Sequence, residues 1–264
     1  MTLAVRMAGM LIVWLLGSCA AFEDEPEELL RQTISSWMAE DNFRFEGSSQ
    51  VKVSDVEIGR AFQFVGEVRG HNEILIKPAS DSVSASGVHR MNGMLRYAKV
   101  NQNWTAADDA SGKSLNPLYT VNPLIHAEHL NRSAKDVVIE QAGAQTDDGT
   151  VLLRATIAED RLAEQLKEQI RREHEEVIRN ALYEARSANN PELAEQLNRF
   201  AEKAGQQLKE ILNTLTIRAD YRLAVEKRNR ILKRLDVVSS LNYELDGKSR
   251  KEVIRTTYEM MRPS

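Results

Sequence analysis

Three stretches of the chain repeat apolar residues at the three- and four-residue spacing of an amphipathic α-helix. The first covers residues 27–41, and its apolar face comprises Leu30, Ile34, Trp37 and Met38. Two longer stretches follow at residues 159–188 and 193–212, separated by the polar segment 187–191. A short polar turn between two long helices predicts an antiparallel helical hairpin.

Elsewhere the apolar period changes to two, which is typical of strands with one buried face. The predicted strands cover residues 43–53, 62–69, 73–77, 90–100, 102–106, 137–141, 151–157, 217–225, 235–245 and 252–261. Short turns such as Asp246-Gly247 join sequential strands, which favours antiparallel pairing. Pro123 allows a short helix over residues 123–130. The pattern therefore predicts an α+β fold around an antiparallel sheet with one wet face.

The first 22 residues have the pattern of a secretory signal. Residues 1–6 carry one positive charge and no acid, and residues 7–16 are uncharged and apolar. This run is shorter than the roughly 20 residues that a transmembrane helix needs, so it indicates a cleaved signal peptide. The run ends in Leu16-Gly17-Ser18-Cys19, which resembles the bacterial lipobox. That resemblance implies cleavage before Cys19 and a lipid on its thiol.

These features divide the chain into three parts. We expect a lipoprotein signal peptide at residues 1–18, a short acidic tether at 19–26, and a single α+β domain at 27–264 with the hairpin inserted at about 159–215. Two or three acyl chains such as palmitate hold a protein on a bilayer far better than one. The expected location is extracytoplasmic, anchored to the bacterial membrane.

Composition and motifs narrow the function classes. The chain has 264 residues, a net charge of −4 and one Cys, so an intramolecular disulfide is excluded and a nucleic-acid partner is disfavoured. No phosphate-binding loop, dinucleotide fingerprint or nucleophile elbow is present. His126 and His129 could share a helix face, but no third metal ligand follows at a sensible spacing. We therefore expect a protein without catalysis, cofactor or metal.

The order of elements over residues 27–261 resembles that of a known group. An N-terminal helix, a strand meander, an inserted helical segment and three closing strands are similar to the Lol-type lipoprotein carriers and the mycobacterial lipid-transfer lipoproteins. The resemblance implies a curved sheet, an open half-barrel, that surrounds helices. The hairpin is larger than the compact helices of those carriers. The order is also similar to that of lipoproteins from Gram-positive spore formers.

The resemblance implies that the protein binds a hydrophobic or lipidic ligand. We expect Tyr221, Leu223, Leu241 and Tyr243 to line the cavity, because each belongs to the apolar set of its strand. A sheet face filled by the chain's own helices fits the same pattern equally well. The alternative function is an interaction or regulatory lipoprotein of the cell envelope, for example a sporulation-related one, whose hairpin docks a protein partner.

Overall fold

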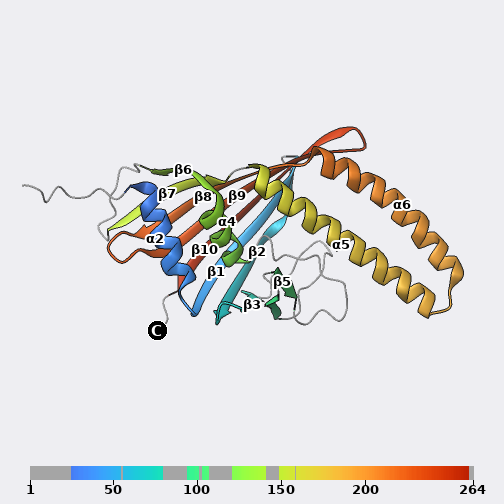
Figure 1. Ribbon diagram of the computed structural model, residues 1–264, viewed down its shortest axis with the longest axis horizontal. Coiled ribbons are helices and arrows are strands. Elements are labelled where there is room, and N and C mark those ends of the chain that lie inside the picture. Colours follow the sequence, from blue (N-terminus) through green and yellow to red (C-terminus); the bar gives the residue numbers. More distant parts are fainter. Residues whose placement is uncertain are drawn as a thin grey trace, which may run out of the picture.

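One antiparallel sheet organises the molecule (Figure 1). The computed structural model describes residues 25–54, 56–79, 94–100, 103–106, 121–140, 149–157 and 159–261. The strands are β1 (Asn42–Val53), β2 (Val56–Arg69), β3 (Glu73–Pro78), β4 (Leu95–Val100), β5 (Asn103–Ala106), β6 (Ala134–Ile139), β7 (Thr150–Ile157), β8 (Thr216–Glu226), β9 (Ile231–Leu245) and β10 (Lys248–Met261). The helices are α2 (Pro26–Met38), α4 (Pro123–Ser133), α5 (Glu159–Ser187) and α6 (Pro191–Thr214).

The strand order brings the two ends of the domain together. It runs β5-β4-β3-β2-β1-β10-β9-β8-β7-β6, with β5 and β6 as the two edges. The first and last strands, β1 and β10, therefore pair at the centre, where Phe45 lies opposite Met260. The sheet curves without closing, which confirms the predicted α+β fold with an open half-barrel.

The inner face of the sheet forms the core because apolar residues alternate along each strand. In β8, Ile217, Ala219, Tyr221, Leu223 and Val225 are buried, whereas the residues between them are partly or fully exposed. Helices α2 and α4 cover this face (Figure 1). The apolar stripe of α2, including Ile34 and Trp37, is buried against the sheet.

Two glycines make room for the aromatic rings of this core. Gly66 lies opposite Phe45, and Gly47 lies opposite Phe64, on the paired strands β1 and β2. A Cβ atom on Gly66 would come within 2.0 Å of the Phe45 ring, and one on Gly47 within 2.6 Å of the Phe64 ring. Each phenylalanine ring thus occupies the space over the glycine of the neighbouring strand.

The hairpin α5–α6 is attached to the sheet at its root and projects beyond it (Figure 1). At the root, Ala163, Leu166 and Leu212 are buried. The carboxylate of Glu210 accepts hydrogen bonds from the backbone N–H groups of Asp246 and Gly247, at 3.1 and 2.9 Å. These bonds tie α6 to the β9–β10 turn, so the root belongs to the body of the molecule.

The structure confirms most of the predicted elements and moves several boundaries. The first helix, the two-helix hairpin and the Asp246-Gly247 turn are confirmed; both turn residues have positive φ, at 53° and 66°. The short helix extends to Ser133 and is capped by Asn122, whose side chain accepts from Leu124 N. Strand β2 begins at Val56, earlier than predicted, because its first residues pair with the end of β1. The lipobox and Cys19 lie outside the described residues.

Candidate functional site

The four residues predicted to line a cavity fall into two separate places. Tyr221 and Leu223 are 1% and 0% exposed and belong to the core. Leu241 lies opposite Ile217, whereas Tyr221 lies opposite Val237. Leu241 and Tyr243 therefore lie four residues or more along the sheet from Tyr221 and Leu223, a distance of about 13 Å at roughly 3.3 Å per residue. The structure does not bring the four side chains into one site.

Tyr221 belongs to a buried polar cluster beneath α4. Its hydroxyl lies 3.3 Å from Nδ1 of His126, and the His126 ring also contacts Tyr258 edge-on, with centroids 5.7 Å apart. Burial lowers the pKa of His126 to about 3, so the ring is neutral near pH 7. Burial likewise raises the pKa of Tyr258 well above its usual value. The cluster is neutral and closely packed by aromatic rings.

Leu241 and Tyr243 lie nearer the hairpin root and are partly buried. The hydroxyl of Tyr243 donates a hydrogen bond to Glu252 on β10. Burial and this hydrogen bond raise the pKa of Tyr243 to about 12. Within the described residues, no group of three or more His, Cys, Asp or Glu side chains could hold a metal ion.

A cavity of about 330 Å³ lies between the C-terminal half of α2 and one end of the sheet. It is lined by Ser36, Trp37, Glu40, Phe43, Arg230, Ile231, Leu232, Lys233, Met260 and Met261. Trp37, Phe43 and Leu232 are each 4% exposed, so the cavity has firm apolar walls. Its volume falls at the lower end of the roughly 300–1,000 Å³ that small-molecule sites occupy. We name it the α2 cavity.

Arg230, Lys233, Glu40 and Ser36 supply the polar part of the α2 cavity. Arg230 donates from Nε to Oε1 of Gln32 at 2.9 Å and from Nη1 to the carbonyl oxygen of Lys227. Lys233 lies 3.2 Å from the Thr150 hydroxyl and 3.8 Å from Glu226. The indole Nε1 of Trp37 is buried and has no hydrogen-bond partner in the described part of the chain. Such an orphaned donor is unusual in a folded protein.

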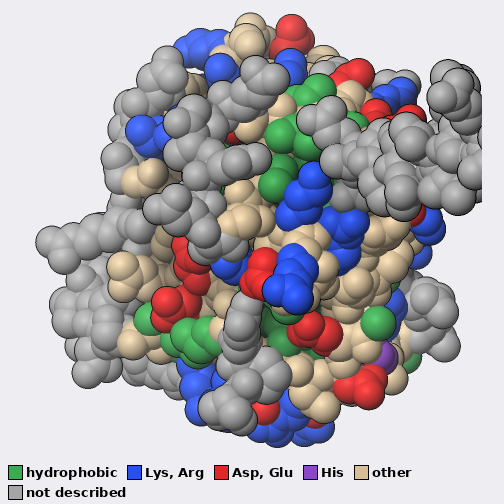
Figure 2. Space-filling view, turned by 90° about the vertical axis from the view of Figure 1, so that its left-hand side faces the viewer, with side chains coloured by type: hydrophobic (Ala, Val, Ile, Leu, Met, Phe, Trp, Pro, Cys, Tyr) green, Lys and Arg blue, Asp and Glu red, His purple; other side chains and the backbone are tan. Residues whose placement is uncertain are grey.

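The β8–β9 turn explains why the two cations lie beside α2. Arg230 ends this turn in the left-handed region, at φ 58°, and its side chain reaches Gln32 on α2. Figure 2 views the molecule from the side of this turn, where Lys and Arg side chains lie next to hydrophobic ones. The contact between this turn and α2 spans 198 residues, so no local pattern in the sequence indicates it.

A second hollow runs along the projecting part of the hairpin. This hairpin groove has a volume of about 560 Å³ and is lined by His174, Glu175, Ile178, Arg179, Leu182, Tyr183, Arg186 and Ala201. Its walls are less buried than those of the α2 cavity: Ile178 and Leu182 are half-buried and Tyr183 is 71% exposed. The groove is therefore larger but more open, and we take the α2 cavity as the better candidate for a small ligand.

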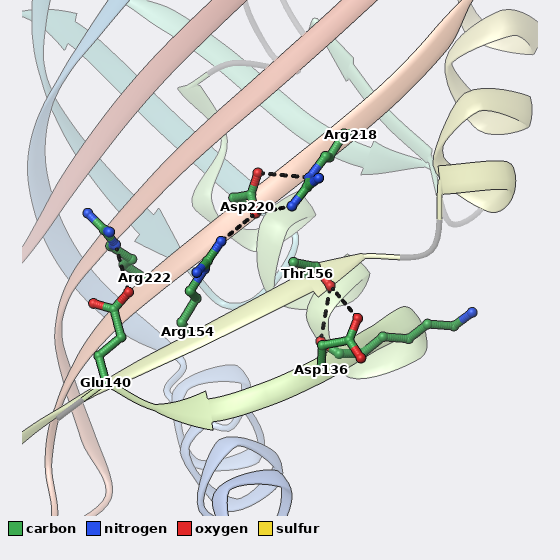
Figure 3. A network of polar contacts seen from close by, with 8 residues as sticks. Asp136, Glu140, Arg154, Thr156, Arg218, Asp220 and Arg222 are labelled. Atoms are coloured by element: carbon green, nitrogen blue, oxygen red, sulfur yellow. Dashed lines mark hydrogen bonds and ion pairs between the residues drawn. The ribbon is translucent and has the colours of Figure 1, made fainter.

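The outer face of the sheet carries a network of paired charges (Figure 3). Asp220 on β8 pairs with Arg218 at 3.2 Å and with Arg154 on β7 at 3.5 Å. Arg222 pairs with Glu140 at 3.2 Å. Because these cations are matched by carboxylates and exposed to water, the network stabilises the strands only weakly and offers no separate ligand site.

Among the described residues, no helix is both long and apolar enough to cross a membrane. No protein-family model matches the chain, and no curated protein matches it either.

Several solved structures resemble this one at low sequence identity. The lipoprotein LppX of Mycobacterium tuberculosis is 12% identical, with a TM-score of 0.34 over 90% of this chain and 96% of LppX. A LolA-superfamily protein from Nitrosomonas europaea is 8% identical, with a TM-score of 0.26 over 91% of this chain and 94% of its own. A structure of lipid–protein interactions in lipovitellin is 8% identical, with a TM-score of 0.37, and this chain spans 25% of it.

The first two of these structures belong to the group that the order of elements resembles.

Proposed function

We propose that the protein is a non-enzymatic, lipid-anchored extracytoplasmic protein that binds a hydrophobic or lipidic anion in the α2 cavity. The observation that carries this proposal is the combination of apolar walls with two cations, Arg230 and Lys233, and one carboxylate, Glu40, around one partly open cavity. Apolar walls with a few placed polar groups are the usual design of a small-molecule site.

The two parts of the cavity would bind the two parts of such a ligand. Each methylene placed against Phe43 or Met260 contributes about 0.8 kcal/mol by leaving water. The anionic group would lie near Arg230, since a hydrogen bond to a charged group is worth about 1.5–3 kcal/mol. A carboxylate or phosphate headgroup with an acyl tail meets these requirements.

The lipid anchor is supported by the sequence. Cys19 follows a short apolar run in a lipobox pattern, and α2 begins at Pro26, seven residues later. Acylation of Cys19 would therefore hold α2 and its cavity near the bilayer, where lipidic ligands are concentrated.

Binding of a fluorescent fatty acid to the purified protein tests the proposal. Arg230→Gln removes a cavity cation, whereas Arg228→Gln makes the same charge change at an exposed residue of the same turn. We expect Arg230→Gln to weaken binding about tenfold or more, since 1.4 kcal/mol is a factor of ten, and Arg228→Gln to leave it unchanged. Arg230→Lys should retain much of the affinity.

Thermal unfolding of each variant separates lost binding from lost folding. Equal affinities for Arg230→Gln and Arg228→Gln, with both folded, would assign the ligand to another site. Absence of saturable binding by the wild-type protein would refute ligand binding of this kind altogether.

A second candidate function is protein docking by the hairpin. Exposed apolar residues on the projecting part of the hairpin favour this function. Val177, Tyr183 and Phe200 are 58%, 71% and 62% exposed. Large apolar side chains gathered on one projecting element are typical of interaction surfaces. This role would use residues distant from the α2 cavity, so the two functions are compatible.

A further inference from the structure

The projecting part of the hairpin has an apolar face that two helices alone do not cover. Ile178 and Leu182 on α5 and Leu197 and Ala201 on α6 are only half-buried, although each belongs to the apolar stripe of its helix. At the root, by contrast, Ala163 and Leu212 are buried by the sheet. Four-helix bundles bury such stripes completely, because each helix contacts two neighbours.

Charged residues flank this apolar face, and some of them have no partner within the described residues of the hairpin. Elsewhere on the hairpin, ion pairs form within one helix, for example Arg171 with Glu168 at 2.5 Å and Arg199 with Glu195 at 3.0 Å. Glu175 and Arg186 line the groove, yet in the described part of the chain neither forms an ion pair or a side-chain hydrogen bond. Arg179 also lines the groove, so an outside partner meets three charges there, of which Glu175 and Arg186 have opposite sign.

The spacing of these two charges fits a second copy of the same helix. If two α5 helices cross antiparallel about a twofold axis between Asn180 and Ala181, Glu175 of each copy faces Arg186 of the other, because both residues lie equally far from that axis. The two charges are 11 residues apart, about 16 Å along a helix that rises roughly 1.5 Å per residue. Both ion pairs then form at once, one on each side of the axis.

The same axis also places the apolar residues in register. Tyr183 of one copy faces Ile178 of the other, since these residues too are equally far from the axis. The exposed Tyr183 ring would enter the partner copy's groove over the small side chain of Ala201. An exposed aromatic residue and a groove that accepts it, present on the same surface, make that surface self-complementary.

We infer that the hairpin groove is a homodimer interface in which two hairpins pair antiparallel as a four-helix bundle. The pairing occupies the groove between α5 and α6 and leaves the α2 cavity at the other end of the sheet untouched. It does not depend on the proposed ligand.

Charge exchange tests this pairing because each substitution acts twice in a symmetric dimer. Native mass spectrometry of the full chain in detergent, over a concentration series, should show a dimer for the wild-type protein. Glu175→Arg places Arg against Arg at both contacts, and Arg186→Glu places Glu against Glu. We expect each to raise the dimer dissociation constant about tenfold or more, since like charges face each other.

Two combinations should restore the dimer. The double variant Glu175→Arg with Arg186→Glu exchanges the charges and should dimerise like the wild-type protein. A mixture of the two single variants should form heterodimers, because one chain then offers only Arg and the other only Glu. Glu184→Arg, an exposed residue outside the groove, makes the same charge change and should have no effect.

Three results would overturn the inference. The first is a wild-type chain that stays monomeric at all concentrations. The second is a dimer that the single charge reversals do not weaken. The third is a monomer whose hairpin binds vesicles of phosphatidylglycerol and phosphatidylcholine, with that binding lost in Leu182→Glu, since the groove would then face lipid.

Discussion

At the scale of single residues, Gly66 and Phe45 show how the strands β1 and β2 fit together. A methyl group on Gly66 would overlap the Phe45 ring at 2.0 Å, and Phe45 is fully buried between Phe64 and Tyr258. We therefore expect Gly66→Ala to destabilise the protein by about 1–3 kcal/mol through overpacking. Gly205, in α6, has nothing within 4 Å of its Cβ position, so Gly205→Ala should stabilise by up to about 1 kcal/mol. Chemical denaturation of both variants measures the contrast, and destabilisation by Gly205→Ala would contradict this explanation.

His126 predicts a specific dependence of stability on pH. Its pKa is lowered to about 3 by burial, whereas in the unfolded chain it is about 6.5. Between these values the unfolded state binds a proton that the folded state does not, so stability falls as the pH falls from about 6.5 toward 3. We expect protonation of His126 to lower the free energy of unfolding by about 1.4 kcal/mol per pH unit within that window. Unfolding free energies at pH 7, 6 and 5 should show a steeper decline for the wild-type protein than for His126→Gln, and parallel curves would contradict the assigned pKa.

The core position of Leu223 gives a test of the inner face of the sheet. Leu223 is 0% exposed, so we expect Leu223→Trp to overpack the core and to lower the free energy of unfolding by about 1–3 kcal/mol. The affinity of the folded protein for a fatty acid should stay the same. If a lipid cavity lies at Leu223, the same change would instead weaken fatty-acid binding with little loss of stability. Denaturant midpoints measured beside binding distinguish the two outcomes.

The sequence predicts which face of β8 Tyr221 and Leu223 occupy, but not what lies against that face. A period of two places both residues inside, as the structure confirms. Whether the inner face is empty or filled depends on α4, where His126 meets Tyr221 across 95 residues. No local pattern carries that contact. For the same reason the sequence places Trp37 on the apolar face of its helix but gives no sign of the cavity that Trp37 and Arg230 share.

At the scale of elements, the hairpin combines a packed root with a projecting part. Ala163, Leu166 and Leu212 bind the root to the sheet, whereas Val177 and Phe200 farther along are 58% and 62% exposed. We expect that replacing residues 175–200 with a short Gly/Ser turn leaves cooperative unfolding intact, because no buried contact with the sheet is removed. Replacing residues 160–213 should lower the urea midpoint more than the shorter deletion does, since the root is lost as well. Circular dichroism during urea unfolding measures both, and loss of cooperativity in the shorter deletion would show that the projecting part is core.

The elements themselves are the part of the fold that the sequence predicts best. Asn190 and Pro191 mark the start of α6, and the Asn190 side chain accepts from Leu193 N at 3.0 Å, as a helix cap does. Such signals are local. The hairpin groove has no such local signal. It forms because the apolar stripes of α5 and α6 stay half-covered where the two helices extend past the sheet.

At the scale of the whole molecule, the proposed lipid anchor would decide where the protein acts. Cys19 is the single cysteine of the chain, so Cys19→Ala removes the only thiol that a diacylglyceryl group could modify. Cells labelled with an alkyne fatty acid should show the label on the wild-type protein, and the variant should lose both the label and the membrane fraction. Label retained by Cys19→Ala would contradict the lipobox assignment.

The central claim is that an anchored protein carries an amphipathic anion in the α2 cavity. Native mass spectrometry of the protein extracted from its own host membranes tests it most directly. We predict a bound species whose mass matches a carboxylate or phosphate with an acyl tail, present on the wild-type protein and on Arg228→Gln. Met260→Trp, which fills the cavity, should lack it. Wild-type protein that carries no such species, or Met260→Trp that carries it equally, would contradict the claim.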